Sequence, residues 1–90
     1  MTIEEDANVV LDFMFKEYLL FNKRTTTRGL LDQFSDWDGR RLDRAVKYLR
    51  DIYAIEVIHT FGNENGLQNF ILKKITPSGI QMAESRVKTP

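Results

Sequence analysis

Cysteine is absent from the 90-residue sequence, and histidine occurs only once, at His59. The absence of cysteine excludes a disulfide-stabilised scaffold, thiol catalysis and every zinc site that needs a thiolate ligand. A single histidine leaves too few side chains for a conventional transition-metal cluster. No nucleophile–base constellation is present either. We therefore expect neither an enzyme nor a bound metal or cofactor.

An excess of charge of one sign is also lacking, because 13 basic and 13 acidic residues give a net charge of zero. This balance excludes a protein coated uniformly with basic residues for nucleic-acid binding. The charges are nevertheless unevenly placed. Residues 1–20 carry five acids and one base, whereas residues 23–50 carry eight bases and four acids. Any contact with nucleic acid must therefore depend on the basic middle segment.

Long apolar runs are missing as well. The longest apolar stretch, Val9 to Phe21, is interrupted by three charged residues and is shorter than the ~20 residues that span a bilayer. The first residues, 1–6, are acidic rather than basic as in a signal peptide. With 42% hydrophobic and 29% charged residues, the sequence predicts one globular domain over residues 1–90. We expect this domain to be cytoplasmic and free of membrane contact.

Helical periodicity predicts two helices in the first part of the chain. The first helix covers residues 2–21, with Thr2 as its N-cap. Acidic side chains occupy its first turn, where the helix dipole favours them. The second helix is short, covers residues 27–34, and is capped by one of the threonines at 25–27.

The third predicted helix has the clearest pattern. It covers residues 36–53, with Ser35 as its N-cap and Asp38 as the acidic member of a capping box. One face of this helix is apolar, and the opposite face is basic. The basic side chains are Arg40, Arg41, Arg44, Lys47 and Arg50.

After the third helix the periodicity changes to that of strands. Residues 55–61 and 68–75 are rich in β-branched and aromatic side chains, and residues 62–66 form a cluster of glycine and asparagine. This pattern predicts an antiparallel hairpin with a five-residue tip. A last helix is predicted over residues 77–86, with Thr76 as its N-cap and a proline at its first position. The fold class is therefore α+β.

Three segments, in this order of elements, resemble the winged helix-turn-helix family. They are Thr26–Leu31, Leu42–Arg50 and Ile75–Glu84. The last is similar to the Leu-Thr-x-x-Gly-x-x-x-x-Glu segment that follows the wing in MarR-like and PadR-like repressors. The resemblance covers residues 2–86 and implies three helices, a two-stranded hairpin wing and a C-terminal helix.

The resemblance also implies how such a domain would bind double-stranded DNA. In this family the third helix enters the major groove, and the wing contacts the adjacent backbone or minor groove. The residues carried over to the third helix are Arg40, Arg41, Arg44 and Lys47. Thr26, Thr27 and Arg28 would contact phosphates at the start of the second helix, where backbone amides favour anions. The three arginines are candidates for reading guanine, which arginine can bind through two hydrogen bonds.

Two features depart from the family pattern. The predicted wing tip, Asn63-Glu64-Asn65, carries an acid where the family often has lysine or arginine, and Lys73 and Lys74 lie further along the strand. The glycine that commonly ends the third helix is replaced by the run Asp51–Ala54.

The first helix is apolar around most of its circumference, beyond the stripe that a surface helix needs. Either the C-terminal helix or a second chain covers the excess, and we favour a second chain. The interface residues then expected are Val9, Phe13, Phe15, Leu19 and Leu20. A homodimer is also what the family resemblance implies, with two recognition helices reading half-sites one DNA turn apart.

Several residues have a structural and a functional interpretation. His59 shares strand parity with Phe61 and the apolar residues before it, so we interpret it as a half-buried structural histidine. Asp36 and Asp38 are better explained by helix capping than by metal binding. We interpret Trp37 as a packing residue, with stacking on nucleic acid as the alternative.

These patterns together predict a small winged-helix DNA-binding protein that acts as a homodimeric transcriptional regulator. Its basic third helix would dock in the major groove. The alternative is a winged-helix module that binds another protein, which the neutral net charge and the acidic wing tip favour. Salt response and sequence preference on DNA would separate the two.

Overall fold

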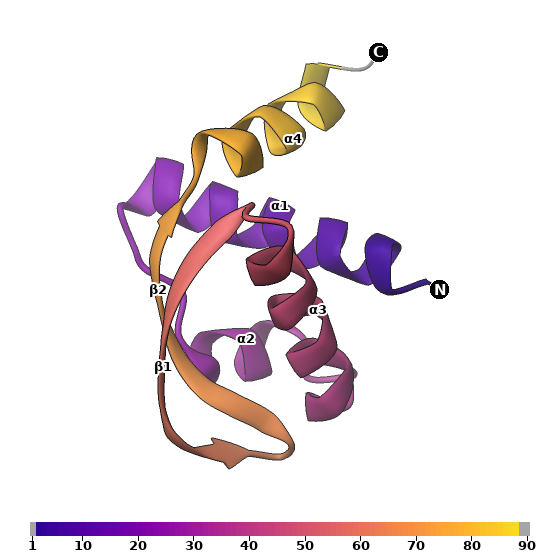
Figure 1. Cartoon of the computed structure of the whole chain (residues 1–90), viewed down its shortest axis with the longest axis vertical. Coiled ribbons are helices and arrows are strands. Elements are labelled where there is room, and N and C mark those ends of the chain that lie inside the picture. Colours follow the sequence, from indigo (N-terminus) through magenta and orange to yellow (C-terminus); the bar gives the residue numbers. More distant parts are fainter. Residues whose placement is uncertain (1, 89–90) are drawn as a thin grey trace.

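The computed structural model describes residues 2–88, which form three helices, an antiparallel hairpin and a fourth helix in that order (Figure 1). The elements are α1 (Ile3–Phe21), α2 (Thr27–Gln33), α3 (Gly39–Asp51), β1 (Ile55–Glu64), β2 (Leu67–Ile75) and α4 (Pro77–Lys88). This order confirms the α+β class and is compatible with a winged-helix layout. None of these helices is both long enough and apolar enough to cross a membrane.

The core lies where α1 and α3 pack against each other and against the inner face of the hairpin. Figure 1 shows α1 crossing the molecule between α4 and the pair α2 and α3, with the hairpin along one side. Each of the six elements contributes at least one apolar side chain that is almost fully buried. They include Val10, Leu11 and Met14 from α1, Leu42, Val46 and Leu49 from α3, and Phe70 and Leu72 from β2. The opposite face of α3 is left at the surface.

Two of the predicted N-caps are confirmed by their hydrogen bonds. Thr2 and Glu5 form a reciprocal capping box, in which the Glu5 N–H donates to Thr2 Oγ1 at 3.1 Å and the Thr2 N–H donates to Glu5 Oε1 at 3.0 Å. At α4, the Gly79 N–H donates to Thr76 Oγ1 at 3.1 Å. Caps are set by neighbours three residues away, so the sequence alone identifies them.

Of the three threonines before α2, Thr26 is the N-cap, because its Oγ1 accepts from the Gly29 N–H at 3.3 Å. Thr25 and Thr27 instead accept hydrogen bonds from the backbone of β2. The Leu72 N–H donates to the Thr25 carbonyl at 2.8 Å. The start of α2 is therefore fixed to the hairpin before the helix begins.

The predicted start of α3 is wrong by three residues. The helix begins at Gly39, and its N-cap is Asp38, whose carboxylate accepts from the Arg40 N–H at 2.9 Å. Residues 34–37 instead form a turn, in which the Trp37 N–H donates to the Phe34 carbonyl at 2.9 Å and the two rings pack. Gly39 itself meets the hairpin tip, since a Cβ there would collide with the carbonyl of Asn65.

The end of α3 also differs from the prediction, which extended the helix to residue 53. The helix ends at Asp51, and Tyr53 adopts a left-handed conformation with φ of 61°. The Ala54 N–H donates to the Leu49 carbonyl at 2.9 Å, and the Tyr53 N–H donates to the Arg50 carbonyl at 3.0 Å. This is the Schellman arrangement, in which glycine usually occupies the position that Tyr53 takes here.

The hairpin is longer than predicted, and its tip is shorter. The strands extend to Glu64 and from Leu67, so the turn is the dipeptide Asn65-Gly66, with φ of 54° and 93°. Two left-handed residues are the requirement of a type I′ turn, and asparagine–glycine is the pair that meets it most readily. The predicted five-residue tip at 62–66 is therefore wrong. Gly62 belongs to an irregular part of β1, between His59 and Asn63.

Candidate nucleic-acid interface

The exposed face of α3 carries two arginines one helical turn apart. Arg40 and Arg44 are both exposed, and neither guanidinium forms an ion pair within the described part of the chain. Because no internal ion pair has to break first, two such guanidinium groups can contact phosphates or the edges of guanine. Both side chains are exposed, as the helical pattern predicted, and their contact with DNA stays a prediction.

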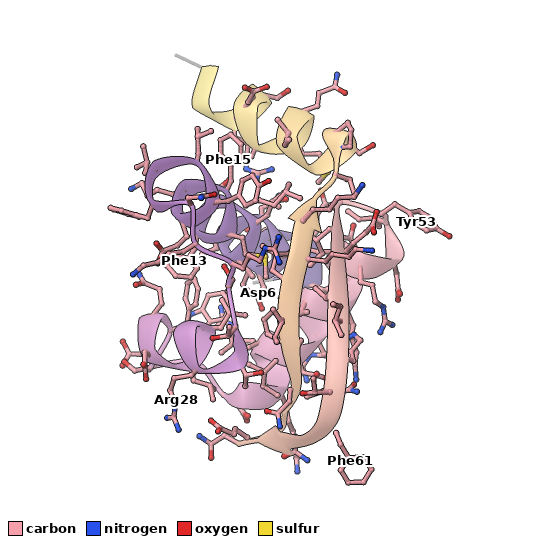
Figure 2. The ribbon with its side chains drawn as sticks, turned by 90° about the vertical axis from the view of Figure 1, so that its left-hand side faces the viewer. Asp6, Phe13, Phe15, Arg28, Tyr53 and Phe61 are labelled. Carbon is pink, nitrogen blue, oxygen red and sulfur yellow. The ribbon has the colours of Figure 1, made fainter. Side chains whose placement is uncertain are left out.

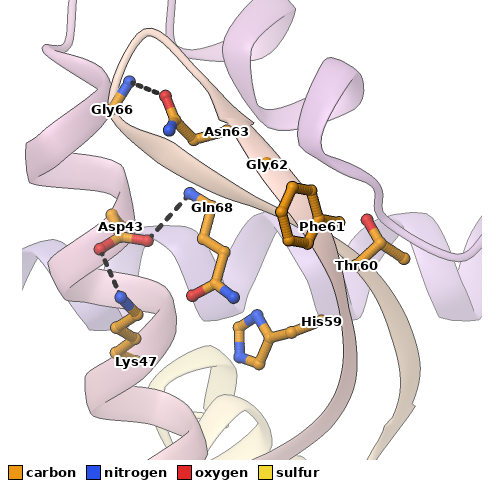
Figure 3. Close-up of a pocket in the computed structure, with 9 residues that line it drawn as sticks. All are labelled: Asp43, Lys47, His59, Thr60, Phe61, Gly62, Asn63, Gly66 and Gln68. Carbon is orange, nitrogen blue, oxygen red and sulfur yellow. Dashed lines mark hydrogen bonds and ion pairs between the residues drawn. The ribbon is translucent and has the colours of Figure 1, made fainter.

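Lys47 lies on the same face but is held by an acidic neighbour. Its Nζ is 3.0 Å from Asp43 Oδ2, in the favourable order for an ion pair four residues apart on a helix. The other carboxylate oxygen of Asp43 accepts from the Gln68 N–H of β2 at 3.1 Å. Asp43 thus joins α3 to the hairpin and places the Lys47 ammonium at the edge between them (Figure 3).

Arg41 does not belong to the exposed basic face, which corrects the prediction made from the helical pattern. Its Nε donates to Asp6 Oδ2 at 2.8 Å, and one terminal nitrogen donates to Asp6 Oδ1 at 2.9 Å. The guanidinium carbon also lies 3.7 Å from the centre of the Trp37 ring. The hydrogen bonds from Arg41 lower the pKa of the Asp6 carboxyl below its ordinary value, since they favour the charged form. Arg41 therefore fixes α3 to α1.

The three residues at the start of α2 have different environments. Thr26 is exposed, but its hydroxyl is used in the cap. Thr27 is only 7% exposed, and its Oγ1 accepts from the Phe70 N–H at 2.9 Å. Burial and this bond to β2 keep the Thr27 side chain away from solvent, which argues against the expected phosphate contact of this side chain. Arg28 has a side chain that is 70% exposed and points away from the body of the protein (Figure 2).

Arg28 also alters the significance of the acid at the hairpin tip. One terminal nitrogen of Arg28 is 3.5 Å from Glu64 Oε2. The acid at the predicted wing tip would by itself repel phosphate. The carboxylate has a cationic neighbour, so its repulsion is partly offset at short range. At this exposed position the pair itself contributes little to stability.

A groove of about 630 Å³ separates the exposed face of α3 from β1 and the hairpin tip (Figure 3). Its α3 wall contains Asp43 and Lys47. Its hairpin wall is formed by side chains and backbone of His59, Thr60, Phe61, Gly62, Asn63, Gly66 and Gln68. Most of the lining residues can donate or accept hydrogen bonds, and Phe61 is the one lining residue with a large apolar side chain.

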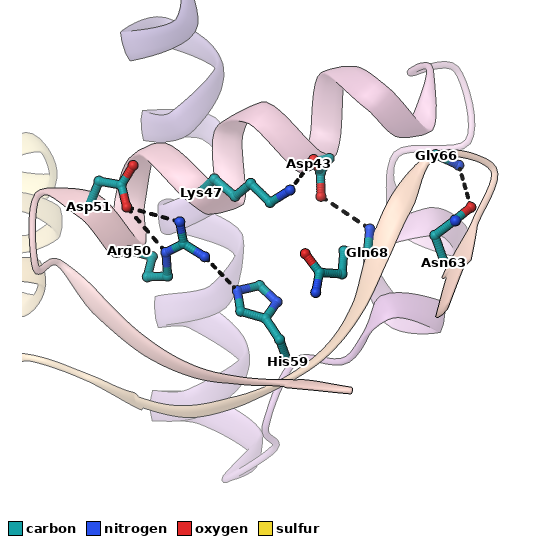
Figure 4. A network of polar contacts seen from close by, with 8 residues as sticks. All are labelled: Asp43, Lys47, Arg50, Asp51, His59, Asn63, Gly66 and Gln68. Carbon is teal, nitrogen blue, oxygen red and sulfur yellow. Dashed lines mark hydrogen bonds and ion pairs between the residues drawn. The ribbon is translucent and has the colours of Figure 1, made fainter. Parts of the chain in front are cut away.

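Arg50 of α3 and His59 of β1 connect the two walls at the end of the groove away from the hairpin tip (Figure 4). A terminal nitrogen of Arg50 lies 3.0 Å from His59 Nε2, and Arg50 also donates to Asp51 Oδ1 at 3.1 Å. A guanidinium can only donate, so His59 Nε2 accepts and its ring proton is on Nδ1. Nδ1 is buried and has no hydrogen-bond partner within the described residues. Burial, followed by the charges of Arg50 and Lys47, lowers the pKa of His59.

The sequence did not reveal three of these features. The Asp43–Gln68 and Arg50–His59 links join residues on different elements, and no spacing rule indicates such pairs. Phe61 was expected on the inner face of β1 with His59. The irregular register after His59 reverses that expectation. The sequence placed Gly62 in the hairpin tip, whereas it lies inside β1, where a glycine often marks such an irregularity.

The expected dimer residues on α1 divide into two groups. Leu19 and Leu20 are each 64% exposed, and Val9 is also exposed. Phe15 is half-buried and lines an apolar groove of about 330 Å³ with Leu19 and Leu20. Phe13 packs edge-on against Phe34, with ring centres 5.7 Å apart, so this chain itself covers much of it. The exposed apolar surface is therefore concentrated at the C-terminal end of α1.

Comparison of this chain with models of protein families, with curated proteins and with solved structures gives no match. The functional interpretation consequently depends on the geometry described above.

Proposed function

We propose that this protein binds double-stranded DNA through the exposed face of α3 and acts as a transcriptional regulator of the winged-helix type. One observation carries the proposal. Arg40 and Arg44 are exposed and unpaired by acids within residues 2–88, on the helix face that borders the hairpin groove. A helix with a free arginine face fits the width of the major groove.

In the proposed mode, the residues of the basic segment have separate tasks. Arg40 and Arg44 contact bases or phosphates in the major groove, and Arg28 contacts the backbone from the start of α2. Arg41 and Arg50 instead hold α3 against α1 and β1, so that its exposed face is presented in one orientation. Because two of the basic residues support the scaffold, the interface is smaller than the sequence alone indicated.

The test is fluorescence anisotropy of a labelled random-sequence duplex, titrated with protein at several salt concentrations. Log affinity should fall linearly with log salt, with a slope of about −0.9 for each phosphate contact. The double variant Arg40→Ala/Arg44→Ala should fold normally, since both side chains are exposed. It should bind at least about tenfold more weakly, and the slope should decrease by up to about 1.8 if both arginines contact phosphates.

The matched control is Lys73→Ala/Lys74→Ala, which removes the same charge from the end of β2 that adjoins α4. Both lysines lie near Glu56, at 3.9 and 3.4 Å, and neither lines the groove. The control should retain most of the affinity. Absence of binding by the wild-type protein at low salt, or equal losses in both double variants, would overturn the proposal and favour a protein-binding module.

We further propose that the DNA-binding form is a homodimer that associates through the C-terminal end of α1. The support is the apolar groove of Phe15, Leu19 and Leu20, flanked by Asp12 and Lys16. The Asp12 carboxylate already binds Arg86 of α4 at 2.6 Å, so the contact between two copies related by a two-fold axis would be the shared apolar centre.

A further inference from the structure

Phe61 is the most exposed large hydrophobic residue of the described chain, with a relative exposure of 102%. Its ring projects away from the body of the protein at the lower part of the hairpin (Figure 2). A fully exposed phenylalanine ring stays in contact with water in the folded monomer. It therefore contributes no hydrophobic stabilisation to the fold. The ring is therefore fully available to a ligand or partner.

The backbone around Phe61 is built to turn this ring outward. Regular alternation would place Phe61 on the inner face of β1 with Ile55, which is buried. The register is instead irregular between His59 and Asn63, and the following Gly62 has φ of 92°, in the left-handed region. The Asn69 side-chain amide donates to the Phe61 carbonyl at 3.1 Å and holds the irregular segment against β2.

The polar groove beside Phe61 favours a nucleobase as the partner of the ring. Phe61 borders the groove together with the Lys47–Asp43 ion pair and the carboxamides of Gln68 and Asn63. An apolar protein surface would remove this ion pair and these carboxamides from water without offering them hydrogen-bond partners. A base with its phosphate provides a flat face for the ring, hydrogen-bonding edges for the amides and a negative charge for the lysine.

We propose that Phe61 contacts a base step directly, stacking on or wedging into it when α3 is in the major groove. This inference rests on the DNA binding proposed above and adds a base-contacting residue on the hairpin. An apolar wedge partly unstacks one step and bends the duplex, and the energetic cost is smallest at flexible pyrimidine–purine steps such as TA. Phe61 thereby gives the protein a preference for deformable DNA that the arginines do not supply.

The experiment compares two duplexes of equal length and charge. One has alternating A and T, so that TA steps occur throughout, and carries 2-aminopurine in place of one adenine. The other is an A-tract, which is stiff and contains no TA step. The wild-type protein should bind the alternating duplex more tightly and increase its 2-aminopurine fluorescence, because unstacking relieves quenching of that base.

Three variants make the test specific. Phe61→Ala should lose the fluorescence increase and weaken binding to the alternating duplex by about fivefold or more, with an unchanged salt slope. Phe61→Tyr, which retains the ring, should behave as wild type. Ile58→Ala removes another exposed apolar side chain of β1 that does not line the groove, and it should have no effect.

The outcomes separate this inference from the proposed function. If the wild-type protein binds neither duplex, both proposals fail. If it binds with a normal salt slope but Phe61→Ala leaves fluorescence and duplex preference unchanged, DNA binding stands and the role of Phe61 is overturned. If Phe61→Ala instead abolishes self-association in sedimentation, the ring occupies a protein contact, which also overturns the inference.

Discussion

At the residue scale, charged side chains that share one helix face have different tasks. Arg40, Arg41 and Arg44 are close in sequence, yet Arg41 binds an acid 35 positions away on α1 while the other two remain at the surface. The sequence could predict that α3 has a basic face. It could not identify which arginines stabilise the fold, because the choice depends on where Asp6 lies after folding.

His59 is the one histidine of the chain, and its environment predicts a specific pH dependence. Its pKa is lowered in the folded protein, so the unfolded chain binds the proton more readily. Stability should therefore be complete above the unfolded pKa of about 6.5 and decrease as pH falls from there towards the lower folded value. Urea unfolding at pH 7.5, 6.5 and 5.5 would measure this decrease.

The variant His59→Gln provides the control, because its amide oxygen can still accept from Arg50 but does not titrate in this range. Its stability should vary less between pH 7.5 and 5.5 than that of the wild type. An NMR titration of the single imidazole should give a pKa below 6.5. A value at or above 6.5 would contradict the half-buried, neutral state assigned to His59.

At the element scale, local signals placed most elements correctly, and long-range contacts decided the errors. Thr2 and Thr76 were identifiable as caps because their partners are three residues away. The start of α3 was not identifiable in this way, because Ser35 and Asp38 are both residue types that commonly occupy an N-cap. The choice is made by the packing of Phe34 on Trp37 and by the hairpin backbone against Gly39.

The same reasoning applies to the candidate site. The groove exists because α3 and the hairpin are joined through Asp43 and Gln68, which are 25 positions apart. The two hairpin glycines looked equivalent in the sequence. Asn65-Gly66 makes the turn, whereas Gly62 makes the irregular segment that exposes Phe61. Which glycine turns the chain is decided by the register that packs the inner face of β2 on the core.

The junction of α3 and β1 contains conformational strain that can be relieved. Tyr53 has a positive φ at the position where glycine is usual, and its side chain is 78% exposed. Tyr53→Gly should raise the free energy of unfolding by about 1 kcal/mol, since it removes the Cβ clash and few contacts. In a domain of this size, the midpoint of thermal unfolding should rise by roughly 4–8 °C.

Tyr53→Ala is the matched control for this prediction. It removes the ring but keeps the Cβ, so it should bring no comparable gain in thermal or urea unfolding. If both variants gain equally, the ring rather than the backbone is the unfavourable feature. If Tyr53→Gly is destabilised, the exposed ring has a stabilising contact that outweighs the strain.

At the scale of the whole molecule, the exposed arginine face and the exposed apolar surface occupy different elements. The first is on α3, and the second is at the C-terminal end of α1, which lies on the far side of the molecule from α3 in Figure 1. A second copy can therefore bind without covering Arg40 or Arg44. The longest dimension of the molecule is 38 Å, of the same order as the ~34 Å that separates half-sites one DNA turn apart.

The proposed dimer makes a prediction about self-association. In Leu19→Glu/Leu20→Glu, two acids replace the most exposed apolar side chains of α1, and a two-fold interface would bring four of them together. Sedimentation should show the wild type as a dimer and this variant as a folded monomer. The matched variant Ile58→Glu/Ile71→Glu adds the same charge to exposed cross-strand neighbours of the hairpin and should remain dimeric.

DNA binding should change in a related way, because a dimer doubles the number of phosphate contacts made in one binding event. The monomeric variant should retain the arginine face of α3, and its salt slope should be about half that of the wild type. Its affinity for DNA should fall by more than the loss of one residue's contact would cause, because the second half-site is no longer bound in the same event. A wild-type protein that sediments as a monomer, or a Leu19→Glu/Leu20→Glu variant that remains a dimer, would show that the end of α1 is not the interface.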